Sequence, residues 1–283
     1  MGQLYICATP IGNLEDITFR VVRILKEVDL IAAEDTRNSV KLLNHFEIKT
    51  KMTSYHEYNK VDKAKYLVKQ MAAGLDVALI TDAGTPAISD PGEELVRQCH
   101  EAGIPVTSLP GACAAVTALT RSGQTTRRFA IEAFLPADKK ERAQVLSSLE
   151  QESRTIILYE APHHLQKTLK ELYEVLGDRK LTICKELTKR HEAALLTTLS
   201  EAVEHYMKET PRGEYVLVIE GKSFEEQRAE NRRQWEVMSI AEHLDYYLDM
   251  GMEKKTAMKQ VAKDREISKR EVYAVTIEGK NTF

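Results

Sequence analysis

Residues 81–92 read TDAGTPAISDPG, and this stretch decides how the chain folds. It follows the apolar run 77–80, which has the pattern of a buried strand, and it leads into a predicted helix that begins near Asp90. Gly84 permits a positive φ and lets a ligand approach the backbone closely. In an alternating α/β chain, a loop of this kind at a strand's carboxyl end binds small ligands. The alternative for this loop alone is a tight turn in which Asp90 caps the next helix.

Strand-like runs alternate with helical patterns on both sides of this loop. The first series has expected strands at 4–8, 30–33, near 52, 77–80 and 106–109, and expected helices at 17–27, 37–46, 63–73, 93–102 and 112–119. The second has expected strands at 129–134, 155–159, 181–184, 195–199 and 215–219, and expected helices at 139–150, 162–176 and 201–208. The first series is typical of a doubly wound α/β domain, and polar residues 121–127 indicate a boundary before the second.

The chain beyond Gly221 changes character. Residues 223–233 are highly charged and suit a linker or a solvated helix, and two or three helical patterns without strands follow from Ile240. We therefore expect an α/β fold of two α/β domains, 1–121 and 122–222, followed by a linker and a small basic helical unit at 223–283.

Composition limits the possible functions. The chain has 283 residues, 43% hydrophobic content and a net charge of −3, so it is not a generally basic nucleic-acid coat, and a polyanion must be met by local patches. Apolar runs are too short to span a membrane, and the amino terminus lacks the pattern of a secretory signal. The four cysteines have no metal-ligand spacing and are expected to be buried free thiols. We expect a cytoplasmic protein without a metal site.

Four more loops at strand ends accompany the first. They read ATPIGNLED at 8–16, AEDTR at 33–37, PGA at 110–112 and YEAPH at 159–163. None has the GxGxxG or GxxxxGKS/T spacing of the common nucleotide-binding loops. The alternative for 33–37 is a helix cap by Asp35 or Thr36 with a local ion pair. Five such loops together predict one cleft between two α/β domains.

These segments resemble the tetrapyrrole methylase superfamily, and within it the ribosomal RNA small subunit methyltransferase I branch. The matching segments, in the family's order, are 8–18, 32–37, 81–92, 109–115, 128–136, 158–165, 185–192 and 212–221. The resemblance implies a methyltransferase that uses S-adenosylmethionine, holds it in the interdomain cleft and usually forms a homodimer. The branch methylates the ribose 2′-hydroxyl of a cytidine in small-subunit rRNA. Ala133 stands where the branch more often has glycine.

The resemblance also implies roles for individual residues. The methyl donor's pocket is expected to involve Pro10, Asp82, Gly84, Thr85, Pro86 and Asp90, with Pro110, Ala112 and Ala161 completing its walls. The acceptor hydroxyl needs a base or a well-aligned hydrogen bond, and the candidates in family motifs are Asp35, Glu160, Lys185, Glu186, Lys189 and His191. Among these we favour Asp35 or Glu186 as the base, and Lys189, Arg37 and Arg190 are suited to phosphates.

The basic carboxyl-terminal helices separate three possible functions. Lys254, Lys255, Lys269 and Arg270 give a small basic unit, which is either a solvated helical hairpin or, as the resemblance favours, an RNA contact. The leading hypothesis is an rRNA ribose methyltransferase. A corrin or porphyrin methylase would not need the basic unit, and a non-catalytic RNA- or ribosome-binding relative need not bind the methyl donor.

Overall fold

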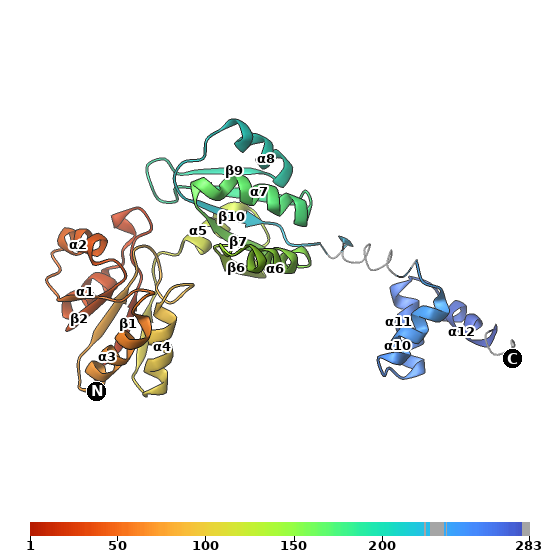
Figure 1. The fold of residues 1–283 in the computed structure, drawn as a ribbon, viewed down its shortest axis with the longest axis horizontal. Coiled ribbons are helices and arrows are strands. Elements are labelled where there is room, and N and C mark those ends of the chain that lie inside the picture. Colours follow the sequence, from red (N-terminus) through yellow and green to blue (C-terminus); the bar gives the residue numbers. More distant parts are fainter. Residues whose placement is uncertain (224, 227–234, 236, 279–283) are drawn as a thin grey trace. The chain divides into compact units, whose positions relative to one another are not determined.

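The protein is described by a computed structural model of residues 1–223, 225–226, 235 and 237–278. The chain divides into two compact units, one of residues 1–149 with 154–220 and the other of residues 150–153 with 221–283. The first unit holds two five-stranded sheets (Figure 1). The predicted domain boundary at 121/122 lies between these sheets, and the division into 1–121, 122–222 and 223–283 stays a prediction.

The first sheet is entirely parallel, with the strand order β3-β2-β4-β1-β5. Its strands are β1 (Leu4–Cys7), β2 (Leu30–Ala33), β3 (Met52–Ser54), β4 (Val77–Ile80) and β5 (Val106–Leu109). The helices between them are α1 (Phe19–Glu27), α2 (Thr36–His45), α3 (Lys60–Ala72) and α4 (Gly92–Glu101). The loop after β1 also contains a short 3-10 helix, η1 (Leu14–Asp16), which the sequence pattern did not predict.

Helices cover both faces of this sheet because side chains alternate along each strand. In β4, Val77 and Leu79 pack against α3 and α4, whereas Ala78 and Ile80 pack against α1 and α2. The adjacent strands β1 and β4 are therefore followed by helices on opposite faces, α1 and α4. The carboxyl ends of these two strands therefore mark the place where open α/β sheets form a ligand-binding crevice.

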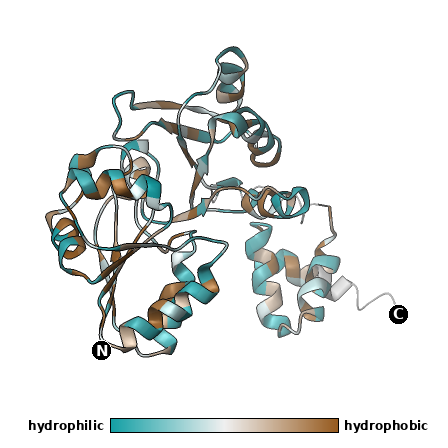
Figure 2. Cartoon of the chain, turned by 60° about the vertical axis from the view of Figure 1, so that its left-hand side comes forward, coloured by the Kyte–Doolittle hydropathy of each residue, from teal (hydrophilic) through white to brown (hydrophobic). Residues whose placement is uncertain are grey.

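The second sheet is mixed and has the order β6-β7-β10-β8-β9. Its strands are β6 (Phe129–Ala133), β7 (Thr155–Glu160), β8 (Lys180–Lys185), β9 (Ala193–Thr198) and β10 (Tyr215–Ile219). Only β6 and β7 pair in parallel, whereas β7, β10, β8 and β9 pair antiparallel. The helices α6 (Lys139–Glu150), α7 (Pro162–Leu176) and α8 (Leu199–Lys208) cover one face. The helices flanking the sheets carry both hydrophobic and hydrophilic residues (Figure 2).

The other face of the second sheet is covered by α5 (Ala114–Ser122), which directly follows the last strand of the first sheet. Ala115, Ala118 and Leu119 are buried against alternate residues of the sheet, among them Val216 and Val218. The helix ends at Gly123, whose φ of +70° gives a left-handed cap. Since α5 begins two residues after the loop 110–112, it ties the crevice of the first sheet to the second sheet.

The second unit contains α10 (Ile240–Asp249), α11 (Lys254–Asp264) and α12 (Lys269–Glu278), which share a core of Leu244, Ala257, Val261, Ala262 and Val272. Ser268 accepts a hydrogen bond from the Glu271 N–H (3.3 Å) at the start of α12, as expected for a cap. The expected linker or helix at 223–233 lies mostly outside the described residues. In the part of the chain that the structure describes, no helix is long and apolar enough to cross a membrane.

Candidate active site between the two sheets

Three of the five predicted loops are joined by backbone and hydroxyl hydrogen bonds. The N–H of Thr9 donates to the carbonyl of Gly84 (2.9 Å), and the N–H of Gly84 donates to the carbonyl of Thr9 (3.0 Å). The Thr9 hydroxyl also donates to the Thr81 carbonyl (3.0 Å), and Thr85 donates to the carbonyl of Ala112 (2.9 Å). The loops after β1, β4 and β5 therefore form one rigid surface at the crevice.

The loop 81–92 holds an uncommon backbone conformation. Gly84, Ala87 and Ser89 have φ values of +84°, +66° and +58°, and the last two residues rarely adopt this region. The carboxylate of Asp90 stabilises the turn, because it accepts hydrogen bonds from the N–H groups of Ala87 (2.9 Å) and Gly92 (2.6 Å). Burial raises the pKa of Asp90 despite these bonds. Asp90 thus shapes the loop, and α4 starts at Gly92, one residue before the expected range 93–102.

The two adjacent carboxylates after β2 have different surroundings. Glu34 lines the cavity described below and accepts a hydrogen bond from the Thr81 hydroxyl (2.5 Å). Asp35 caps α2 through the N–H of Arg37 (2.8 Å) and pairs with the guanidinium of that residue (2.7 Å). The hydrogen bond from the Arg37 side chain lowers the pKa of Asp35 to about 2. The alternative of a helix cap with a local ion pair therefore describes the contacts of Asp35.

Asp82 connects the same two loops. Its carboxylate accepts hydrogen bonds from the N–H of Asp35 (3.3 Å) and from the Asn38 side chain (3.0 Å). It holds the start of α2 beside the loop 81–92 and does not line the cavity. The Asp82 side chain therefore stabilises the loop 81–92 from outside the cavity.

The second sheet supplies aromatic and acidic side chains to the site. The rings of Phe134 and Tyr159 are 5.6 Å apart, and burial raises the pKa of Tyr159. Before them, Ala133 has a φ of +54° at an irregularity in the pairing of β6 with β7, so it holds a conformation that glycine adopts without strain. Glu160 accepts hydrogen bonds from the Ala161 N–H (2.8 Å) and from Thr168 (2.5 Å), which occupies its carboxylate at the start of α7.

A lysine lies between two carboxylates at the rim. Lys189 donates to Glu186 (2.9 Å) and to Glu214 (2.8 Å), and the N–H of Glu214 donates to Glu186 (2.9 Å). Burial acts to raise the pKa of Glu186, but the bonds from Lys189 and the Glu214 N–H outweigh it, and the pKa is lowered. Burial likewise acts to lower the pKa of Lys189, and its two carboxylate partners reverse the effect. Glu186 and Lys189 therefore stay charged near neutral pH.

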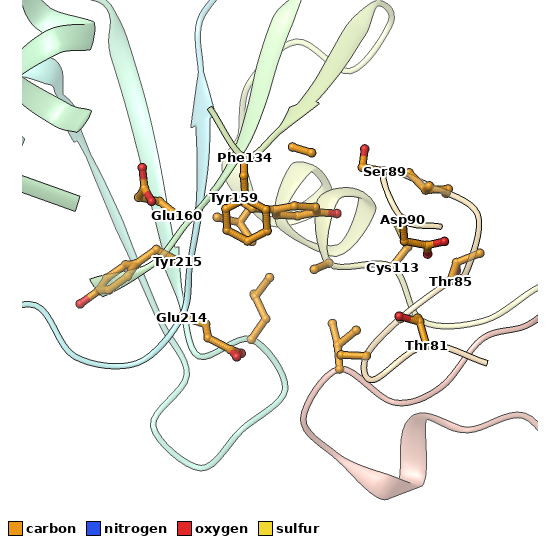
Figure 3. Close-up of a pocket in the computed structure, with 18 of the residues that line it drawn as sticks. Thr81, Thr85, Ser89, Asp90, Cys113, Phe134, Tyr159, Glu160, Glu214 and Tyr215 are labelled. Carbon is orange, nitrogen blue, oxygen red and sulfur yellow. The ribbon is translucent and has the colours of Figure 1, made fainter. Parts of the chain in front are cut away.

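These loops surround a cavity of about 530 Å³ in the first unit. Four of the five predicted loops line it, and the fifth, 110–112, is followed directly by the lining residues Cys113 and Ala114. Figure 3 shows Thr81, Thr85, Ser89, Asp90 and Cys113 opposite Phe134, Tyr159 and Glu214, whereas the side chains of Glu160 and Tyr215 point away from them. The charged side chains of the lining are Glu34, Asp90, Glu160 and Glu214, and the lining contains no lysine, arginine or histidine. The cavity is therefore acidic and suits a positively charged ligand.

The residues expected to hold the methyl donor divide into two groups. Gly84, Thr85, Asp90 and Ala161 line the cavity, whereas Pro10, Asp82, Pro86, Pro110 and Ala112 lie outside its lining. Ala112 still contributes to the shape of the cavity, because its carbonyl accepts the hydrogen bond that holds the Thr85 hydroxyl in place.

The other expected residues lie outside the cavity, with one exception. Glu160 lines it, whereas Asp35, Lys185, Glu186, Lys189 and His191 do not. Arg37 and Arg190 are exposed, and Lys254, Lys255, Lys269 and Arg270 are exposed in the second unit.

Among the described residues, no cluster of His, Cys, Asp and Glu side chains could hold a metal ion. All four cysteines are free, and Cys113, expected to be buried, is partly exposed in the cavity lining.

Sequence reasoning missed several residues of the cavity, among them Glu34, Ile88, Ser89, Phe134, Tyr159 and Glu214. The alternation of side chains offered a signal for Glu34, since neighbouring residues at a strand end point to opposite sides. No local pattern identifies Glu214, because it lies in a short turn whose position depends on the pairing of β8 with β10.

Comparisons with known proteins identify the family of this chain. The family described as Tetrapyrrole (Corrin/Porphyrin) Methylases matches residues 3–203. The "Ribosomal RNA small subunit methyltransferase I" of Halalkalibacterium halodurans is 48% identical over 274 residues, which are 97% of this chain and 94% of that protein. The protein of that name from Thermotoga maritima is 44% identical over 222 residues, which are 78% of this chain and 100% of that protein.

Solved structures share the fold at low sequence identity. The uroporphyrin-III C-methyltransferase of Thermus thermophilus complexed with S-adenosylhomocysteine has a TM-score of 0.56 and is 18% identical, covering 77% of this chain and 97% of that one. Diphthine synthase has a TM-score of 0.62 at 12% identity, and the match covers 77% of this chain and 90% of that one. The expected architecture of two α/β sheets with a helical carboxyl-terminal unit is confirmed. The chain therefore belongs to the tetrapyrrole methylase family, within its ribosomal RNA small subunit methyltransferase I branch.

Proposed function

We propose that this protein uses S-adenosylmethionine to methylate the ribose 2′-hydroxyl of a cytidine in small-subunit rRNA. The observation that carries the proposal is the acidic cavity lined by four of the five predicted loops, in a chain closely related to rRNA methyltransferases. We also infer that the protein is cytoplasmic, where ribosomal subunits are made.

The cavity fits the methyl donor in size and charge. Its volume of about 530 Å³ lies within the roughly 300–1,000 Å³ typical of small-molecule sites. S-adenosylmethionine carries a sulfonium and an ammonium, which favour a lining that has acidic residues and no basic one. When bound, S-adenosylmethionine supplies an electrophilic methyl group.

Named residues would hold this cofactor. The backbone around Gly84 and Thr85 is fixed by Thr9 and Ala112 and offers groups for polar contacts. Tyr159 and Phe134 offer an aromatic wall for the adenine ring. Glu34 and Asp90 would meet hydroxyl or ammonium groups. The chain's own contribution is to position the reactants and to exclude water from the cavity.

The acceptor hydroxyl requires alignment more than a strong base from these residues. Asp35 and Glu186, the expected bases, both have lowered pKa values, so they are ionised at neutral pH but accept protons weakly. We propose that they align the acceptor side of the site, while Lys189, Arg37 and Arg190 meet phosphates.

The second unit supports the choice of RNA as substrate. Lys254 and Lys255 occupy the first turn of α11, and Lys269 and Arg270 occupy the first turn of α12. Positive side chains are unfavourable at helix amino termini, whereas phosphates are favoured there. Both helix starts therefore suit RNA phosphates, and we propose that they dock the ribosomal substrate.

The test is methylation of small ribosomal subunits that lack the modification. The protein is incubated with them and with S-adenosylmethionine labelled in its methyl group, and the label is mapped by nuclease digestion. The proposal expects label on the ribose of one cytidine. Labelling of uroporphyrinogen instead would favour the alternative of a corrin or porphyrin methylase. Binding of subunits with neither S-adenosylhomocysteine binding nor methylation would favour the non-catalytic alternative.

A further inference from the structure

Phe19 is the first residue of α1, and its side chain is 96% exposed. The start of the helix does not need this ring, because the Thr18 hydroxyl makes the cap by accepting from the Val21 N–H (3.1 Å). The ring lies at a surface hollow that also includes Leu14 and Phe46. An exposed aromatic ring at such a hollow is available for stacking on a flat partner.

A continuous strip of surface joins this hollow to the cavity. Ile11 lines the cavity, and residues 12–15 line a second hollow beside Lys189 and Arg190. Leu14 and Glu15 belong both to this second hollow and to the hollow at Phe19. One short loop, residues 11–19, therefore runs from the cavity through the second hollow to the exposed ring.

Gly12 brings the two α/β domains together along the strip. A Cβ atom at Gly12 would lie 2.5 Å from Cγ of Lys189 and 3.0 Å from the carbonyl oxygen of Leu187, so glycine is required for this contact. The close approach places the basic side chains of the second domain beside the loop of the first.

Unpaired positive charge lies along the strip and not in the cavity. The cavity lining has four acidic residues and no basic one. The charged residues of the two hollows, apart from His45, are Arg23, Lys26, Lys189 and Arg190 against Glu15 and Glu27, and of the basic ones Arg23 pairs with Glu27 and Lys189 with Glu186 and Glu214. Within the described chain, the side chains of Lys26 and Arg190 have no hydrogen-bond or ion-pair partner and are exposed. The strip is therefore suited to a polyanion, and the cavity is suited to a cation.

We propose that the strip guides a single-stranded segment of RNA and that Phe19 stacks on an unpaired base of the same segment as the target nucleotide. The inference rests on the proposed function and adds a base-stacking site to it. Aromatic rings combined with basic side chains are the usual means of binding single-stranded nucleic acid, because every base has a face for stacking. Lys26 and Arg190 then meet the phosphates on either side of Leu14.

The experiment compares Phe19→Ala and Phe19→Trp in methylation of small subunits that lack the modification. Phe19→Ala should raise KM for the subunit at least about fivefold. Its kcat should stay within about twofold, and Phe19→Trp should restore KM because it keeps a stacking ring. Affinity for S-adenosylhomocysteine, measured by calorimetry, should not change. The matched control is Tyr58→Ala, since Tyr58 is 98% exposed and lines neither hollow.

Charge variants test the rest of the strip. Lys26→Gln should weaken subunit binding and reduce the slope of log affinity against log salt by about one, because one phosphate contact is lost. An unchanged KM in Phe19→Ala would overturn the inference. So would a loss of dimer in Phe19→Ala, seen by light scattering in parallel with the rise in KM, because the hollow would then be covered by a second copy of the chain. Methylation by the wild-type protein tests the proposed function, and the Phe19 variants test the stacking site. The proposed function and the stacking site can therefore fail separately.

Discussion

Gly84 links backbone conformation to ligand binding at the scale of a single residue. Its φ of +84° is strained for any other residue, and a Cβ atom there would touch Ile11 at 3.4 Å, an ordinary contact distance. Backbone strain, more than lack of space, therefore requires glycine at this position.

Gly84→Ala should weaken S-adenosylhomocysteine binding at least tenfold, or about 1.4 kcal/mol. The strain would be relieved by a shift of the loop that pairs with Thr9 and carries Thr85. The matched control is Gly103→Ala, whose φ of +67° is also positive but which has nothing within 4 Å of a new Cβ and lies away from the cavity. Both variants should lose about 1 kcal/mol of stability, and calorimetry should show weakened binding only for Gly84→Ala. If Gly84→Ala bound S-adenosylhomocysteine as tightly as the wild type, the donor site would lie elsewhere.

Asp35 gives a pH-dependent prediction. Its pKa is about 2 in the folded protein, below the ordinary value of 3.8, because of its hydrogen bonds with Arg37. A lowered folded pKa means that the carboxylate stabilises the fold above about pH 4 and that this contribution is lost as the pH falls toward 2. The difference in Tm between wild type and Asp35→Asn should therefore shrink from about pH 5 to pH 3. A constant difference would show that the charge of Asp35 does not contribute.

At the scale of the element, α5 connects the cavity to the second sheet. Ala118 is fully buried against that sheet, and Cys113 and Ala114 at the start of the same helix line the cavity. Ala118→Leu should overpack this contact, cost about 1–3 kcal/mol and weaken S-adenosylhomocysteine binding by shifting the helix. Val116→Leu is the matched control, at a position that is 46% exposed on the same helix. It should change neither the stability nor the affinity for S-adenosylhomocysteine. Thermal melting and calorimetry measure both effects. Unchanged binding in a destabilised Ala118→Leu would show that α5 does not position the cavity.

At the scale of the whole molecule, the two compact units should have separable roles. Every residue of the acidic cavity lies in the first unit. Truncation after Gly221 should therefore leave S-adenosylhomocysteine binding nearly intact and sharply reduce methylation of small subunits. Charge reversal at Lys254, Lys255, Lys269 and Arg270 should reproduce the loss, and both should be measured with labelled methyl donor at moderate salt.

The similar protein from Thermotoga maritima is fully matched by 78% of this chain, so a relative of that name can be shorter. The defect of the truncated protein should accordingly appear mainly in KM and recover as the subunit concentration rises. Circular dichroism checks that the α/β unit stays folded. A full methylation rate at low subunit concentration would show that the second unit does not dock RNA.

The assembly of the whole molecule is a separate prediction. The resemblance to this family implies a homodimer, and closed twofold symmetry is the commonest arrangement for chains of one kind. Light scattering at micromolar concentration and moderate salt should give twice the monomer mass of 32.1 kDa. A monomer under these conditions would count against the dimer.

The order and type of the elements could be predicted because the signals are local. The run 77–80 was expected as a buried strand and is β4, fully buried on both faces, and the Pro162 start of α7 followed from proline's fixed φ. The start of α4 was placed near Asp90 because an aspartate usually caps the helix that follows it. The carboxylate of Asp90 does accept from the N–H of Gly92, the first residue of α4, but it also accepts from Ala87 in a turn where Ala87 and Ser89 have positive φ. No local pattern predicts such a strained turn.

From the sequence alone it follows that the chain alternates strands and helices, that five loops with polar or small residues follow strand ends, and that the chain belongs to a methylase family. Periodicity, proline and glycine act over a few residues, so they are readable from the chain. Only the tertiary structure decided that β1 and β4 are neighbours with helices on opposite faces, that the second sheet is mixed, and that Glu34 faces the cavity while Asp35 caps α2. These facts depend on pairing between distant segments, and the burial that selects one pairing is a property of the whole fold.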